Sequence, residues 1–274
     1  MGALEAIDSW PATTVAAGWR QATDAPTSRG ATTHRFPLAS VTKPLVALSV
    51  LVAVEEGSLA LDQPAGPPGS TVAHLLSHSS GLAPEAGENA VLSRLGTRRI
   101  YSNQGYEVLA QVLEGSTGID VATYVREAIL DPLGMTDTAL EGSPAHGAVG
   151  TVADLLRLGG ELLRPRLLAP DTMARATSVH LPRLDGVLPG FGRQAPNPWG
   201  LGLEIRGDKY PHWTGAGNSP HTYGHFGRAG TFFWVDPEAD GFLVVLTDRP
   251  FGPWAGRAWP HLSDAVLAEM TSAA

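Results

Sequence analysis

The spacing of apolar residues changes from strand-like to helical and back along this chain of 274 residues. The strand-like segments are residues 14–20, 33–36, 199–205, 230–235 and 241–247. The helical segments are 40–56, 71–78, 103–117, 121–130, 152–163 and a final one at 260–270. Strands near both ends with helices between them predict an α+β fold, in which one sheet is built from both termini and a helical lobe is inserted.

We expect one domain over residues 1–274, made of two lobes. The sheet and its flanking helices are expected from 1–65 together with 195–274, and the mostly helical lobe from 66–194. The longest apolar stretch, 45–54, is interrupted by Ser49 and is too short to cross a bilayer, so it predicts a buried helix.

Lysine is rare in this chain, and one of the two lysines lies three residues after a serine. Lys43 and Lys209 are the only lysines among 19 lysine and arginine residues. Pro44 is tolerated only in a first helical turn, which places Ser40 at the start of the helix and brings the Lys43 amine onto the same face. Unlike arginine, a lysine beside a helix N-terminus or in a dry pocket can become neutral. Ser40 and Lys43 are therefore candidates for nucleophile and base.

Two further motifs carry polar groups suited to acyl transfer. Tyr101 and Asn103 precede a helix, where they could relay the serine proton and bind an acyl group, or form only a turn with an N-cap. The segment 225–228 reads His-Phe-Gly-Arg beside a strand, where a glycine usually marks close backbone approach or a bulge. Here Gly227 could let the strand edge approach a substrate, and the next backbone N–H could complete an oxyanion hole. His225 could hydrogen-bond the substrate or Tyr101.

Together and in order, these motifs resemble the serine β-lactamase and penicillin-binding protein superfamily, in particular the serine hydrolases similar to class C enzymes and small esterases. The segments that carry the resemblance are 38–43, 75–82, 101–106, 131–135, 150–155, 199–202 and 224–230. The resemblance implies a β-lactamase/transpeptidase-like fold with an antiparallel sheet flanked by helices.

The resemblance also implies roles for these residues. Ser40 would be acylated, and Lys43 and Tyr101 would share the work of the general base, in an order the sequence leaves open. Asn103 would contact the acyl group, and the backbone N–H groups of Ser40 and Arg228 would hold the oxyanion.

The expected substrate follows from a departure from the family pattern. Where penicillin-recognising members often carry Lys-Thr/Ser-Gly, this chain has His225 and Phe226 before Gly227. A phenyl group replaces a hydroxyl, and histidine is largely neutral at pH 7, although Arg228 could restore some positive charge. We expect a carboxylesterase acting on small neutral esters, with weak β-lactam hydrolysis as a secondary activity. The alternatives are a D-amino-acid peptidase or amidase, an acyltransferase, and a non-catalytic sensor or scaffold.

Composition limits the remaining classes. A net charge of −8 without a basic run argues against nucleic acid or an anionic membrane surface as partner. The absence of cysteine and of a visible signal peptide fits a cytoplasmic protein. His74 and His78 have the spacing of a zinc pair, but no glutamate follows His74 and no third ligand is evident, so we expect neither metal nor cofactor. Compact segments at 83–99 and 183–198 predict an open pocket, with Trp199 or Trp213 as its lining. The oligomeric state stays open.

Overall fold

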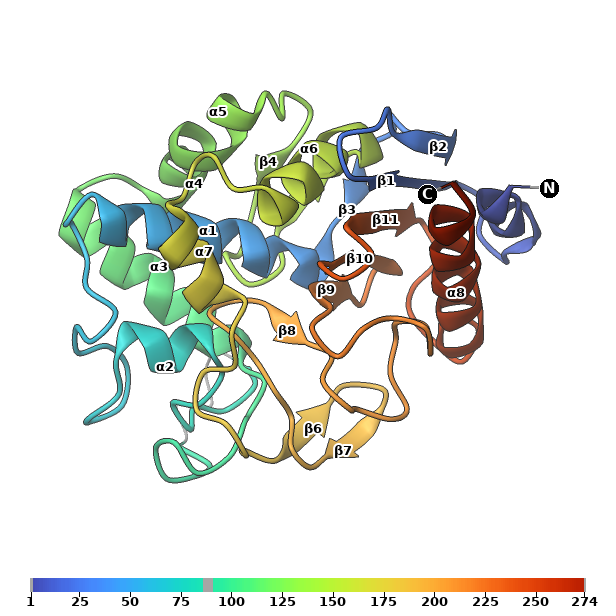
Figure 1. Ribbon diagram of the computed structural model, residues 1–274. Helices are drawn as coiled ribbons and strands as arrows, with labels where there is room; N and C mark the ends of the chain where they lie inside the picture. The colour runs from blue at the N-terminus through green and yellow to red at the C-terminus, as the bar shows by residue number, and fades with distance from the viewer. Residues whose placement is uncertain (1, 86–90, 274) are drawn as a thin grey trace.

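The computed structural model describes residues 2–85 and 91–273 and is built around one antiparallel sheet (Figure 1). The strands follow the order β2-β1-β11-β10-β9-β8. Their bounds are β1 Val15–Gln21, β2 Thr27–Gly30, β8 Glu204–Ile205, β9 Tyr223–Gly227, β10 Thr231–Asp236 and β11 Gly241–Thr247. Since Val15 of β1 pairs with Thr247 of β11, the two ends of the chain meet in the middle of the sheet. The predicted α+β fold with a sheet from both termini is confirmed.

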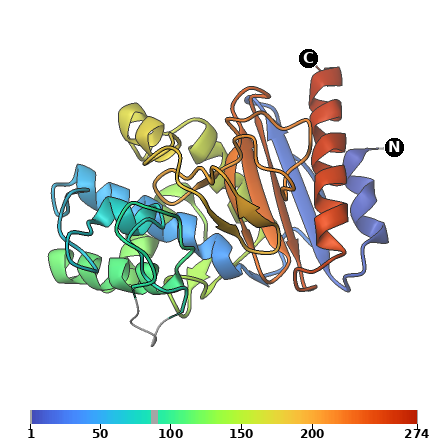
Figure 2. The ribbon, with the colours of Figure 1, turned by 90° about the horizontal axis from the view of Figure 1, so that it is seen from below.

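Helices cover both faces of the sheet. α8 (Ala255–Ala273) and η1 (Ala3–Ser9) lie on one face, and α6 (Val152–Leu163) lies on the other (Figure 2). Every residue of β11 is buried, because alternate side chains of this strand enter the two cores on opposite faces. A Cβ at Gly159 would overlap the Phe242 ring, so this glycine is what lets α6 lie close to β11.

The helical half of the molecule surrounds α1 (Thr42–Glu55), which is almost entirely buried. Its neighbours are α3 (Asn103–Thr117), α4 (Val121–Val125) and the π-helix η3 (Arg126–Leu130). The remaining helices are α2 (Val72–Leu76), which packs on α3, α5 (Asp131–Leu133) and α7 (Pro170–Ala176). No helix in the described ranges is long and apolar enough to cross a membrane.

Three predicted elements were wrong in their bounds. Residues 33–36 do not form one strand: Gly30, at φ +83°, ends β2, and a turn leads to β3 (Phe36–Pro37), which pairs with β5 (Ala148–Gly150). Only the end of 199–205 is a strand, because Gly202 turns at φ +91° to pack on α1. The last helix starts before Pro260, at Ala255. The sequence did not reveal β4 (Ala139–Leu140) or the hairpin of β6 (Gly186–Leu188) and β7 (Gly192–Gln194).

Two helices lie in the other half of the molecule from the one that the predicted lobes give them. α1 comes from the segment 1–65 but lies among the helices, and α6 comes from 66–194 but covers the sheet. The division at these boundaries stays a prediction.

Candidate active site

Ser40 lies in a tight turn between the small sheet and the central helix. The turn is η2 (Ala39–Val41), a 3₁₀ turn, and α1 begins directly after it, so Lys43 is in the first turn of α1 as expected. Ser40 itself precedes the α-helix, and Ala39 adopts a left-handed conformation with φ +46°. The Lys43 amine lies 3.4 Å from the Ser40 hydroxyl oxygen.

The Gly227 backbone packs closely against this turn. A Cβ at position 227 would lie 2.5 Å from the Leu38 carbonyl oxygen and 3.2 Å from the Ala39 Cβ. Gly227 does not line the cavity. Its close approach is therefore to the turn that carries Ser40, and the role of Gly227 in making room for a substrate stays a prediction.

Lys43 is fully buried and its direct partners are uncharged. Its amine donates to Asn103 Oδ1 at 2.7 Å and to the Ala145 carbonyl at 2.8 Å. No ion pair in the described ranges includes Lys43. Burial lowers the pKa of Lys43 to about 7, although the charges of Glu85 and Glu107 oppose the shift. Lys43 therefore loses its proton far more readily than an exposed lysine.

Tyr101 lies beside this amine and keeps its proton. Its ring centroid is 4.6 Å from Lys43 Nζ. Burial raises the pKa of Tyr101 well above its usual value, even though the nearby Ser40 favours the ionised phenol. No hydrogen bond of normal geometry to the Tyr101 hydroxyl is found among the described residues. At neutral pH this group is a protonated phenol whose hydroxyl lies close to Ser40.

The Asn103 side chain does not cap α3, because its neighbour Ser102 does. The Ser102 hydroxyl caps α3 by accepting from the Gly105 N–H at 3.0 Å, so the N-cap role falls to Ser102. The Asn103 amide then accepts from Lys43 and donates to Glu85 at 3.2 Å.

Two neutral histidines flank Tyr101 and have opposite tautomers. His225 Nδ1 donates to the Phe226 carbonyl at 2.7 Å, which leaves Nε2 as a bare acceptor. Burial, together with the charge of Lys43, lowers the pKa of His225 to about 3. His78 Nδ1 accepts from the Ser102 N–H at 3.2 Å, which places its proton on Nε2. The His78 and Tyr101 ring centroids are 4.7 Å apart, a contact that sequence reasoning missed.

These groups open onto a cavity of about 720 Å³. The predicted residues that line it are Ser40, Tyr101, Asn103, Trp199, His225, Phe226 and Arg228. Lys43 lies beneath Ser40 and is not exposed to the cavity. Phe226 also packs against Phe251, with ring centroids 5.3 Å apart. The backbone N–H groups of Ser40 and Arg228 have no backbone acceptor within the described ranges.

The two compact segments supply part of the cavity wall. Pro84, Glu85 and Leu92 come from 83–99, and residues 187–190 come from 183–198. Residues 86–90 of the first segment lie outside the described residues.

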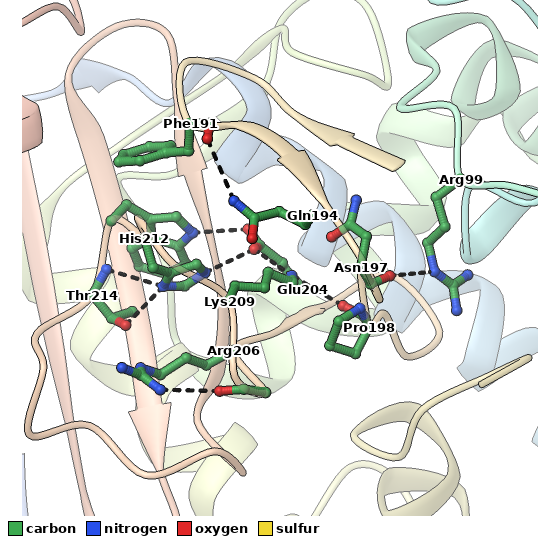
Figure 3. Close-up of polar contacts among 12 residues, drawn as sticks. Arg99, Phe191, Gln194, Asn197, Pro198, Glu204, Arg206, Lys209, His212 and Thr214 are labelled. Carbon is green, nitrogen blue, oxygen red and sulfur yellow. Dashed lines mark hydrogen bonds and ion pairs between the residues drawn. The ribbon is translucent and has the colours of Figure 1, made fainter. Parts of the chain in front are cut away.

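The second lysine belongs to a buried polar cluster that sequence reasoning did not find (Figure 3). Lys209 Nζ lies 2.6 Å from Glu204 Oε1 and donates to the Pro198 carbonyl at 3.1 Å. His212 Nε2 lies 2.9 Å from the same Glu204 oxygen. Trp213 donates to Glu204 Oε2 at 2.8 Å and does not line the cavity, whereas Glu204 does.

The ion pair in this cluster stays charged. Burial alone would raise the pKa of Glu204, but Lys209 and His212 together hold it well below its usual range. Burial lowers the pKa of Lys209 to about 8, and Glu204 limits the fall. The one feature of the sequence that pointed to this cluster was the rarity of lysine.

The described residues contain no group of three His, Cys, Asp or Glu side chains placed to hold a metal ion. His74 Nδ1 instead bonds the Thr71 hydroxyl at 2.8 Å, and His78 Nδ1 is taken by the Ser102 backbone.

Comparison with known proteins places the chain in a family. The β-lactamase family model matches residues 10–268, and the chain belongs to that family. Its members are serine hydrolases, among them β-lactamases, esterases and carboxypeptidases. A crystal structure of a β-lactamase from Mycobacterium bovis is 54% identical, with a TM-score of 0.96, over 98% of this chain and 99% of that chain.

Curated relatives match over shorter stretches. Esterase EstB from Burkholderia gladioli is 34% identical over 37% of this chain and 37% of its own length. A putative D-alanyl-D-alanine carboxypeptidase from Salmonella heidelberg is 27% identical over 58% of this chain and 47% of its own. The chain thus spans less than half the length of these relatives.

Proposed function

We propose that this chain is a serine hydrolase that forms an acyl-enzyme on Ser40 and acts as a carboxylesterase on small neutral esters. The observation that carries the proposal is Lys43, a buried amine that has no ion pair within residues 2–85 and 91–273 and lies 3.4 Å from the Ser40 hydroxyl. A lysine that is neutral near pH 7 can take the proton of a serine and still return it. The intact set of Ser40, Lys43 and Tyr101 speaks against a non-catalytic scaffold.

In the proposed reaction, neutral Lys43 takes the Ser40 proton as the serine oxygen attacks the ester carbonyl. The backbone N–H groups of Ser40 and Arg228, which have no backbone acceptor in the described ranges, are suited to hold the oxyanion. When the carbonyl re-forms, the alkoxide leaves with a proton from Tyr101, and Lys43 returns its proton to Tyr101. Water then attacks the acyl-enzyme by the same route in reverse and releases the acid.

The substrate preference follows from two groups in the wall of the cavity at Ser40. His225 is neutral, and Phe226 offers a ring where a hydroxyl would bind a carboxylate. This pair weakens binding of an anion next to the reacting carbonyl and favours neutral esters. The similarity to a β-lactamase from Mycobacterium bovis supports weak β-lactam hydrolysis as the second candidate.

Labelling with a fluorophosphonate tests the nucleophile, and turnover tests the substrate. We expect one adduct by intact mass on the wild type and on Ser58→Ala, a matched exposed-serine control, and none on Ser40→Ala. We also expect turnover of p-nitrophenyl esters well above that of nitrocefin. An unlabelled wild type would overturn the hydrolase proposal, and nitrocefin turnover without ester turnover would reverse the substrate preference.

A further inference from the structure

A second cleft, of about 600 Å³, adjoins the cavity at Ser40 and is rich in arginine. It is lined by Thr97, Arg98, Arg183, Asp185, Gly186, Val187 and Arg193. The two hollows share Arg98 and Val187 in their lining, so they are adjacent. The chain has a net charge of −8, but three arginines gather around this cleft and make it locally positive.

The positive charge of this cleft is mostly uncompensated. Asp185 pairs with Arg193 at 2.8 Å. Neither Arg98 nor Arg183 has an ion pair within residues 2–85 and 91–273. Two exposed guanidinium groups are therefore free to bind an anion, and their fork of N–H donors suits the oxygens of a carboxylate or phosphate.

The backbone that presents these arginines is held rigidly from inside by Arg99. This buried side chain donates to the carbonyls of Asn197 and Ser77, each at 2.7 Å, and of Leu181 at 3.0 Å, as well as to that of His180 (Figure 3 shows the Asn197 bond). The Arg99 N–H also bonds the Asp185 carbonyl at 2.8 Å.

Glycine and an unusual arginine complete the scaffold. A Cβ at Gly186 would lie 2.7 Å from the Arg99 carbonyl oxygen, so only glycine allows the two segments to lie this close. Arg183 adopts φ +73°, a left-handed conformation that is unfavourable for a residue other than glycine. The cleft is thus preorganised, with little loop ordering left for a ligand to impose.

The route from Ser40 to this cleft runs along one segment of chain. Residues 98–101 and Asn103 all line the main cavity, from Asn103, the expected acyl contact, to Arg98 at the cleft. Arg98 and Asn103 are five positions apart, so their backbones lie at most about 17 Å from each other, a distance that the Arg98 side chain can shorten. Leu92, Ile100 and Val187 add apolar surface to the wall of the main cavity.

We infer that the cleft of Arg98 and Arg183 is a subsite for an anionic group at the far end of the substrate's acyl chain. The inference rests on the proposed acyl-enzyme function and adds to it: the distal end of the acyl group carries a carboxylate or phosphate, which binds in this cleft. An aliphatic chain between the two ends would lie against the apolar wall.

Matched esters test this subsite. Mono-p-nitrophenyl esters of dicarboxylic acids, from adipate to sebacate, are compared with p-nitrophenyl esters of monocarboxylic acids of equal carbon number. We expect the wild type to prefer the anionic member of at least one pair, and Arg98→Gln/Arg183→Gln to lower its kcat/KM by about tenfold or more. The neutral member should change by less than about twofold in the same variant, because it makes no charge-assisted contact. Arg257→Gln on α8, an exposed arginine that lines neither hollow, is the control.

Two further measurements separate the outcomes. Added salt should shrink the anionic preference, and inorganic phosphate should compete with the anionic ester more than with the neutral one if the cleft also accepts phosphate. Turnover of neutral esters without any anionic preference, or equal losses on both members in the double variant, would overturn the subsite while leaving the hydrolase intact. Failure of every ester would instead overturn the proposed function.

Discussion

The two lysines of this chain occupy similar positions and do different things. Both are buried and both lie beside the same cavity wall, Lys43 under Ser40 and Lys209 behind Glu204. Lys209 lies 2.6 Å from a carboxylate, whereas the direct partners of Lys43 are an amide oxygen, a backbone carbonyl and a hydroxyl. Burial lowers the pKa of both, to about 8 for Lys209 and about 7 for Lys43.

The comparison teaches that the counter-charge, and not burial, separates a structural lysine from a candidate base. A buried ammonium beside a carboxylate is stabilised by an attraction that survives desolvation, so it serves to join β8 to the loop that follows it. A buried ammonium beside neutral oxygens has less to hold its proton. The rare-lysine pattern of the sequence contains both cases.

The largest expected effect comes from replacing Lys43 with arginine, a cation that cannot lose its proton. Lys43→Arg keeps the charge, and we expect it to slow acylation of Ser40 by about 10²–10⁴-fold, the usual contribution of a general base. The rate of fluorophosphonate labelling measures this, and the melting temperature checks that the variant is folded. Acylation within a few-fold of wild type would refute Lys43 as the base.

Removing the counter-charge of Lys209 should act on stability. Glu204→Gln leaves a buried ammonium unpaired, and we expect a loss of about 3–5 kcal/mol in the free energy of unfolding, measured by urea titration. The double variant Glu204→Gln/Lys209→Met should recover much of this loss, because it removes the stranded charge. A single variant as stable as wild type would show that the pair is not the structural unit described here.

A smaller effect is expected on the pH dependence of the esterase. Because only neutral Lys43 is active, kcat/KM should rise with pH to a midpoint near 7, the pKa of this lysine. The Glu85 charge raises the pKa of Lys43, so Glu85→Gln should move the midpoint to lower pH. A folded Lys209→Met variant, which alters the other lysine, should keep the wild-type midpoint. A midpoint that is unchanged in Glu85→Gln but shifts in Lys209→Met would show that Lys209, and not Lys43, sets the pH dependence.

Sequence reasoning reached the parts of the site that are local in the chain. The Ser40 and Lys43 pair follows from spacing and from Pro44, and the sheet from both termini follows from the change of period. The sequence did not show the left-handed Ala39, or that Gly227 approaches the Leu38 carbonyl, because both depend on how β9 meets a turn nearly two hundred positions earlier.

The Glu204 cluster was missed for a similar reason. Glu204, Lys209 and His212 have no motif spacing, and only the loop between β8 and β9 brings their side chains together. The cytoplasmic location and the chemical roles of Ser40, Lys43 and Tyr101 stay predictions.

The presence of only two lysines makes the central claim directly measurable. NMR titration of protein labelled with ¹³C and ¹⁵N lysine would show two side-chain amines, assigned with Lys43→Arg. We predict that Lys43 loses its proton with a midpoint near 7, below that of Lys209. A Lys43 amine that stays protonated to the alkaline end of the titration, or that titrates above Lys209, would contradict the account.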